Sequence, residues 1–376
     1  MSISDAEGIY ENYPIFRFIK RITFFTRRAI VYKSLLWTIL FCLGILLGSL
    51  LDGTLILSGE NWGLLQHPTI WAFFFIQAIV PFSINFSLKR LFLFLKKNDL
   101  IDSDLDLAKY IDVLKTYTTR STNLSRMCYY LLFCVGVICF AWNSYQNQAP
   151  YKFVGFDFWD SINHPFGYWT TRLYKIYLWL FFLPALVHIQ FSILMTVNKL
   201  LKEVKAGNRL RLKPYHQDGY GGVGRIIKIV INPVIPVLII SCCGVIGVFI
   251  IHRNFGITLG IGLLILSSLF IFIYLVPAVK LRKIIIAEKK RQLTEISNTQ
   301  NSIFYSLIKN KPDLMHSNID VLNALEPVTK QIKSISNWPY LNSVIKVISI
   351  VNTPIILSGI KQLVPFAYAM LGNIRH

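Results

Sequence analysis

Long apolar stretches separated by shorter polar segments dominate the pattern of the chain. A helix needs about 20 consecutive apolar residues to cross the roughly 30 Å hydrocarbon core of a bilayer. The stretches that meet this requirement predict six transmembrane helices, at about 29–51, 69–87, 127–145, 173–197, 226–251 and 257–279. The sequence therefore predicts an all-α fold, a polytopic membrane helix bundle whose transmembrane domain covers residues 29–279.

The chain after the sixth predicted span contains two further units. Residues 280–340 carry apolar positions at helical spacing on either side of Lys311-Pro312, where proline ends a helix. They predict a cytoplasmic helical hairpin. Residues 341–376 form a hydrophobic segment interrupted by lysines and prolines. We expect this segment to be re-entrant or to lie at the membrane surface, because a full crossing would bury those lysines.

The distribution of basic residues predicts the orientation of the bundle. Lysine and arginine are frequent in residues 1–28 and in the second and fourth loops, whereas residues 52–68 contain neither. Basic loops concentrate on the cytoplasmic side of membranes. We therefore expect an integral protein of the plasma (inner) membrane with both termini in the cytoplasm. Aromatic and basic residues alternate in Tyr10–Arg28, which predicts an interfacial helix along the inner leaflet.

Composition and charge agree with a membrane protein. Hydrophobic residues make up 54% of the chain and charged residues only 15%, whereas soluble domains carry about 25% charged residues. The basic loops expected on the cytoplasmic side account for the formal net charge of +20, so no nucleic acid is expected as a partner. The expected partners are the lipid bilayer and anionic lipids of the inner leaflet. The cysteines lie in or beside spans without metal-ligand spacing, so we expect no metal site, disulfide framework or cofactor.

A glycine-rich loop directly before the fifth span is the strongest local motif. Glycines permit positive φ angles and close approach, and basic residues beside them suit an anion. The motif has three interpretations: a structural connector, a ligand or ion gate, and a catalytic site in which His216 and Asp218 act together. The candidate ligand-binding or gating residues are His216, Asp218, Gly219, Gly221, Gly222, Gly224, Arg209 and Arg211.

Polar and helix-breaking residues inside the spans form a second set of candidates. A polar residue inside a membrane helix is a candidate for a functional role. A helix-breaking residue is also a candidate, because irregular backbone is tolerated mainly where it lines a cavity or packs on protein. The candidate pore or hinge residues are Gln77, Asn85, His188, Gln190, Asn232, Pro233 and Pro236. For His188 the alternative is a neutral imidazole that is hydrogen-bonded to a neighbouring helix.

These features favour a channel- or pore-like protein that is gated from the cytoplasmic side. The alternative is a membrane-anchored sensor or interaction scaffold that signals through its cytoplasmic loops and hairpin. A third hypothesis is a lipid-modifying enzyme, although no residue is assigned a catalytic role. A homo-oligomer and an unidentified cytoplasmic partner at residues 280–340 are both compatible with the pattern.

Overall fold

The computed structural model describes residues 8–23, 30–58, 63–66, 68–96, 101, 106, 109–148, 160–207, 210–213, 215, 221–231, 256–308 and 315–336. Every regular element within these ranges is helical, apart from an isolated bridge between Ile101 and Leu210. The prediction of an all-α fold is therefore confirmed for this part of the chain.

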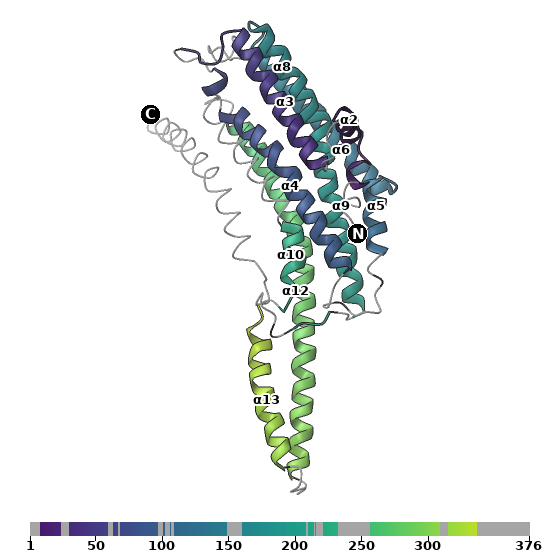
Figure 1. Cartoon of the computed structure of the whole chain (residues 1–376). Coiled ribbons are helices and arrows are strands. Elements are labelled where there is room, and N and C mark those ends of the chain that lie inside the picture. The colour runs from purple at the N-terminus through teal and green to yellow at the C-terminus, as the bar shows by residue number, and fades with distance from the viewer. Residues whose placement is uncertain are drawn as a thin grey trace, which may run out of the picture.

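The helices form an elongated bundle from which one helical pair extends (Figure 1). In chain order they are α2 (Pro14–Ile22), α3 (Ile30–Leu51), the 3-10 helix η1 (Leu64–Gln66), α4 (Pro68–Lys96), α5 (Lys109–Thr118), α6 (Asn123–Gln148), α8 (Pro165–Ile176), the π-helix η2 (Tyr177–Phe182), α9 (Leu183–Ala206), α10 (Gly224–Ile231), α12 (Gly256–Ile308) and α13 (Met315–Ser334). The extending pair consists of the second part of α12 and the whole of α13, which pack against each other.

Among the described residues, three helical segments are long and apolar enough to cross a membrane: Val31–Leu51, Gln77–Leu95 and Pro165–Ala206. Asn123–Ile138, within α6, is a shorter apolar helix. These segments coincide with the first four predicted spans, although their limits differ. The fifth predicted span lies mostly outside the described residues, and the sixth falls within α12. The count of six spans therefore remains a prediction.

The third of these segments is much longer than its predicted span at 173–197. α8, η2 and α9 follow one another without a break over 42 residues. At about 1.5 Å per residue this corresponds to roughly 63 Å, twice the thickness of a hydrocarbon core. Part of the segment must therefore project beyond any bilayer that it crosses. Its last turns carry Lys199, Lys202 and Lys205, which suit an aqueous end.

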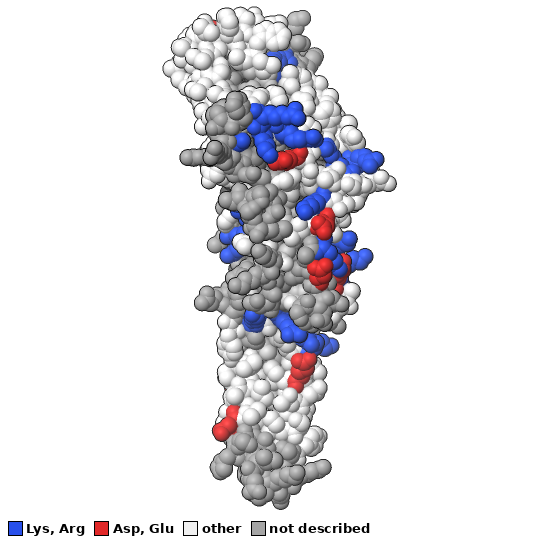
Figure 2. Space-filling view, turned by 45° about the vertical axis from the view of Figure 1, so that its right-hand side comes forward, with Lys and Arg blue, Asp and Glu red and all other residues white. Residues whose placement is uncertain are grey.

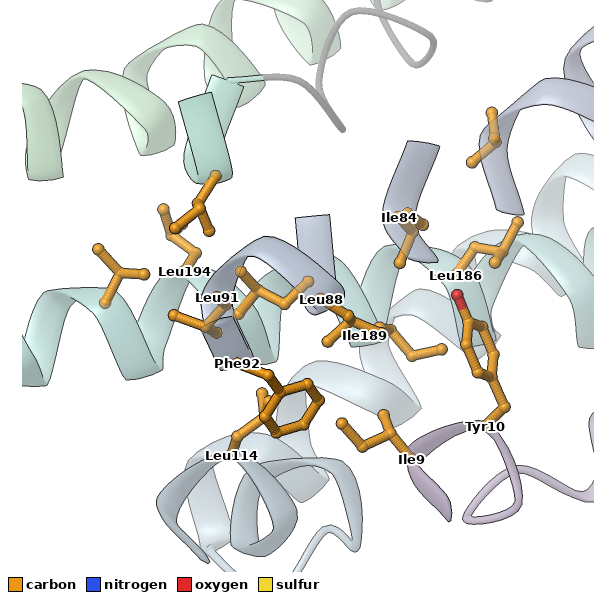
Figure 3. Packing of buried hydrophobic residues seen from close by; sticks show 14 of the residues in the cluster. Ile9, Tyr10, Ile84, Leu88, Leu91, Phe92, Leu114, Leu186, Ile189 and Leu194 are labelled. Atoms are coloured by element: carbon orange, nitrogen blue, oxygen red, sulfur yellow. The ribbon is translucent and has the colours of Figure 1, made fainter. Parts of the chain in front are cut away.

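The ends of α4 and α9 pack with α5 into a core of their own. Leu91 and Phe92 of α4, Leu114 of α5 and Leu194 of α9 are all buried. Figure 3 shows these side chains with those of Ile84, Leu88, Leu186 and Ile189, and with Ile9 and Tyr10 from the N-terminal segment. The long helices thus continue into a packed helical layer at the end of the bundle where α5 lies.

The N-terminal segment lies on the bundle through its aromatic face. Tyr10, Tyr13, Phe16 and Ile19 are almost completely buried, and the rings of Phe16 and Phe182 lie 6.0 Å apart. The Tyr10 hydroxyl donates a hydrogen bond to the carbonyl of Pro81 in α4, at 3.4 Å. Protein therefore covers the aromatic face of this segment, and its position along the inner leaflet stays a prediction.

Gly48 allows α3 and α8 to approach each other closely. A Cβ atom at this position would lie 2.8 Å from Thr170 Oγ1 and 2.9 Å from the carbonyl oxygen of Phe166. At Gly44, one turn earlier on α3, a Cβ atom would meet nothing within 4 Å. The spacing Gly-xxx-Gly therefore includes one residue that packing requires and one that it does not.

We expect Gly48→Ala to lower the free energy of unfolding by about 1–3 kcal/mol, because the added methyl group overpacks the contact with α8. Gly44→Ala is the matched control, and should raise stability by up to about 1 kcal/mol because alanine favours the helix. Thermal unfolding of both variants in detergent measures the difference. Equal effects of the two substitutions would contradict the close α3–α8 contact.

Candidate functional site

The structure places the predicted site residues in separate regions. The candidates that lie outside the described residues are Arg209, His216, Asp218, Gly219, Asn232, Pro233 and Pro236. Those that it describes are Gln77, Asn85, His188, Gln190, Arg211, Gly221, Gly222 and Gly224. The glycines lie where the bundle meets the α12–α13 pair, whereas Gln77 and Asn85 lie on α4 and His188 and Gln190 on α9.

His188 is completely buried and hydrogen-bonded at both ring nitrogens. The Tyr13 hydroxyl lies 2.6 Å from Nδ1, and Nε2 lies 2.9 Å from Ser125 Oγ and 3.0 Å from the Ser125 carbonyl oxygen. Burial raises the pKa of the Tyr13 phenol, so this hydroxyl stays protonated and donates to Nδ1. The carbonyl oxygen can only accept, so Nε2 carries the hydrogen. The imidazole is therefore neutral.

Arg120 joins this arrangement to the α5–α6 connection. Its guanidinium donates a hydrogen bond to the Asn12 carbonyl at 3.0 Å and lies 4.6 Å from the ring centroid of Tyr129. The side chain of Asn12 in turn donates to Thr118 Oγ1 at 3.0 Å. We call Tyr13, Arg120, Ser125, Tyr129 and His188 the His188 cluster. It fixes the N-terminal segment to α5, α6 and α9.

The hydrogen bonds of the His188 cluster hold helices together and do not activate a nucleophile. A serine nucleophile must donate its proton to a basic imidazole nitrogen. Here Ser125 Oγ donates instead to the carbonyl of Tyr117, and the nitrogen that faces it already carries hydrogen. The arrangement matches the alternative considered for His188, a neutral imidazole bonded to neighbouring helices. Because Ser125 lies in the first turn of α6, His188 of α9 packs beside the beginning of that helix.

A second polar group lies where α3, α4 and η2 meet. The Tyr177 hydroxyl is next to the side chains of Gln77 and Ser34, and all three residues are buried. Within the described part of the chain none of these polar side-chain atoms has a hydrogen bond of ordinary geometry, and the same holds for the amide of Gln190 on α9. Buried polar atoms without partners are rare, and π-helical turns such as η2 recur at functional sites.

The described glycines belong to a tightly packed connection. Gly221 and Gly222 have φ angles of +65° and +91°. A Cβ atom at Gly221 would lie 3.0 Å from Leu212 Cδ2 and 3.4 Å from Ile335 Cδ1. Gly221 therefore lies between the segment 210–213 and the end of α13, which fits the interpretation as a structural connector.

α12 contacts the same place with polar side chains. Gln292 Nε2 donates to the Leu212 carbonyl at 3.2 Å, and Lys289 Nζ donates to the Ile335 carbonyl at 2.8 Å. Burial lowers the pKa of the Lys289 ammonium. We call Leu212, Gly221, Lys289, Gln292 and Ile335 the junction. It attaches the base of the α12–α13 pair to the bundle.

A buried carboxylate stands beside the junction on α12. Glu288 accepts two hydrogen bonds of 2.8 Å, from Nε and Nη2 of Arg291, and one of 3.0 Å from Gln292 Nε2. The hydrogen bond to Glu288 raises the pKa of Arg291. Three donors therefore satisfy Glu288, which leaves it a structural role.

Sequence reasoning missed the partners of His188 and most of the junction. Tyr13, Arg120 and Ser125 lie in segments that were expected to be interfacial or loop, and Lys289 and Gln292 carry no local motif. The one available signal was a histidine inside an apolar stretch. The described residues contain no group of three or more His, Cys, Asp or Glu that could hold a metal ion.

The described fold and sites define an all-helical protein with three segments suited to cross a membrane. No protein-family model, curated protein or solved structure matches the chain.

Proposed function

We propose that the protein is a membrane-anchored sensor or interaction scaffold in which the α12–α13 pair presents a surface to a cytoplasmic partner. The observation that carries this proposal is the continuity of α12, which runs for 53 residues from Gly256 to Ile308. At about 1.5 Å per residue it is roughly 80 Å long. One helix therefore links the predicted sixth span to the far end of the hairpin.

The far end of this pair carries exposed aromatic side chains, which supports the same function. Phe304 and Tyr305 are 58% and 66% exposed, and their ring centroids lie 6.5 Å apart. Val321 on α13 is also exposed. Aromatic residues are enriched at protein interfaces, where they supply much of the binding energy. We call Phe304, Tyr305 and Val321 the tip.

Photo-crosslinking in intact cells tests the interaction. A photoreactive amino acid at Tyr305 should give a discrete crosslinked product, whereas the same group at the exposed Lys330 on α13 should not. Phe304→Ala should reduce the Tyr305 product by about tenfold, because an interfacial aromatic contributes about 1–2 kcal/mol. Absence of a product at Tyr305, or identical products at both positions, would contradict the scaffold.

The orientation proposed for this function has the basic end of the bundle in the cytoplasm of a plasma (inner) membrane. Exposed basic side chains on α2, α5 and α9 support it, since such residues concentrate on the cytoplasmic side.

A pore gated from the cytoplasmic side is the second candidate. It is favoured by the amides of Gln77 and Gln190 on α4 and α9, two helices in contact, because within the described residues both amides are buried without hydrogen bonds of ordinary geometry. A polar pathway would use such groups, whereas a sealed bundle leaves them as a cost of about 1–3 kcal/mol each.

Salt flux through liposomes that contain either the natural protein or the Gln77→Leu variant distinguishes the pore from the scaffold. For a pore we expect salt flux through the natural protein and at least a tenfold loss in the variant. For a scaffold we expect sealed liposomes in both cases and a variant that is about 1 kcal/mol more stable, because leucine removes an unpaired amide. Unchanged flux in the variant would exclude Gln77 from a conducting pathway.

A further inference from the structure

The outer face of α2 carries two arginines that have no acidic partner among the described residues. Arg17 and Arg21 are exposed and lie one turn apart, so that like charges repel on one face of the helix. The neighbouring carboxylate of Glu11 is occupied, because it forms an ion pair with Lys20. Neither arginine makes an ion pair within the described residues. Figure 2 shows Lys and Arg side chains gathered at the level of α2.

Two further donors lie on α3, which packs against α2. Lys33 is only 9% exposed and has no ion pair or hydrogen bond in the described part of the chain. The indole Nε1 of Trp37 is buried and likewise lacks an acceptor there. Residues four apart share one face of a helix. That face is turned toward α2, because the rings of Trp37 and Phe18 lie 6.2 Å apart.

The donor groups of Arg17, Arg21, Lys33 and Trp37, which we call the α2–α3 corner, suit an anionic ligand. Three cationic side chains without a counter-charge among the described residues attract an anion, and phosphate oxygens accept hydrogen bonds from ammonium and indole N–H groups alike. Arginine guanidinium groups bind phosphate with two parallel hydrogen bonds. Among the described residues, no carboxylate remains in the cluster to receive a choline or ethanolamine group. The ligand should therefore be anionic as a whole.

The position of the α2–α3 corner suits a lipid ligand. The apolar segment of α3 begins at Val31, so Lys33 lies at the end of a candidate membrane span. Phe18, Ile22 and Tyr32 expose apolar surface around the donors. Aromatic and basic residues together are typical of the depth at which lipid head groups lie.

We propose that Arg17, Arg21, Lys33 and Trp37 form a binding site for the phosphate of an anionic phospholipid. This site goes beyond the proposed scaffold function and does not depend on it. It localises the general expectation of anionic-lipid contact to one corner of the bundle, between α2 and α3.

Native mass spectrometry of the delipidated full-length protein tests the site with phosphatidylglycerol and phosphatidylcholine. The natural protein should bind phosphatidylglycerol in preference. R17Q/R21Q should weaken this binding by about 30-fold, which corresponds to roughly fivefold for each basic residue removed. The control K115Q/K330Q removes the same charge at distant exposed positions and should change binding less than twofold.

A second measurement requires no variant and therefore does not depend on its folding. Phosphatidylglycerol should slow acylation of the Lys33 amine in the natural protein at least fivefold, and phosphatidylcholine should not. Equal effects of the two double variants, or unchanged reactivity of Lys33, would overturn the proposal. Displacement of the lipid by millimolar inorganic phosphate would overturn the assignment to a lipid and indicate a soluble phosphate ligand.

Discussion

His188→Ala is expected to lower the free energy of unfolding by about 3–5 kcal/mol, because it combines a cavity with the loss of buried hydrogen bonds. The imidazole is completely buried and contacts the Tyr13 hydroxyl and the hydroxyl and carbonyl oxygens of Ser125. Without it the Tyr13 hydroxyl, held between helices, has lost its acceptor. Equilibrium unfolding in mixed micelles measures the change.

The substitution should also release the N-terminal segment. Amide hydrogen exchange in residues 8–23 should accelerate by about 100-fold or more in His188→Ala, since several kcal/mol of its attachment are lost. Tyr13→Phe removes only one hydrogen bond and should cost about 1–2 kcal/mol. Tyr130→Phe, at an exposed position on α6, should cost nothing measurable. If His188→Ala behaved like Tyr130→Phe, the His188 cluster would not hold the segment.

Gly221→Val should destabilise the junction by about 3–5 kcal/mol. The positive φ angle of +65° opposes a β-branched residue, and the new side chain would overlap Leu212 and Ile335. We expect hydrogen exchange at the C-terminal end of α13 to accelerate by about 100-fold, while exchange in α3 remains unchanged. Loss of the Tyr305 crosslink in the same variant would connect the junction to the proposed interaction.

Gly53→Val is the matched control for this substitution. Gly53 has nearly the same φ angle, +69°, but a Cβ atom there would meet nothing within 4 Å. It therefore carries the backbone strain without the overlap, and should cost about 1–2 kcal/mol without affecting α13. If the two variants perturbed α13 equally, packing at Gly221 would not attach the hairpin.

Hydrophobic periodicity was sufficient to predict that the chain is helical and where α3 and α4 begin. It did not predict that the helical segment Pro165–Ala206 extends beyond the predicted span 173–197 at both ends, because a helix that leaves a bilayer and enters a protein core stays apolar on one face. Ile189 and Val197 pack on protein, yet their hydropathy cannot be distinguished from that of residues facing lipid.

The candidate site was less accessible to sequence reasoning. Positive φ angles at Gly221 and Gly222 follow from glycine chemistry, so that part of the connector was predictable. The neighbours of His188 are far away in the chain, with Ser125 63 residues and Tyr13 175 residues distant. Only the fold brings them together. The same holds for Phe18 and Trp37, whose rings lie 6.2 Å apart on two different helices.

The long helix α12 contains Pro277, at the point where the helix leaves its predicted span. From there to Ile308 it extends about 46 Å. A bend of about 20°, a size typical of proline kinks, would sweep the far end of the helix through about 16 Å. In the predicted topology the hairpin is thus a lever arm, which pivots about Pro277 at the predicted membrane boundary. Rearrangements of an ångström or two among the packed helices would be amplified several-fold where Phe304 and Tyr305 meet the solvent.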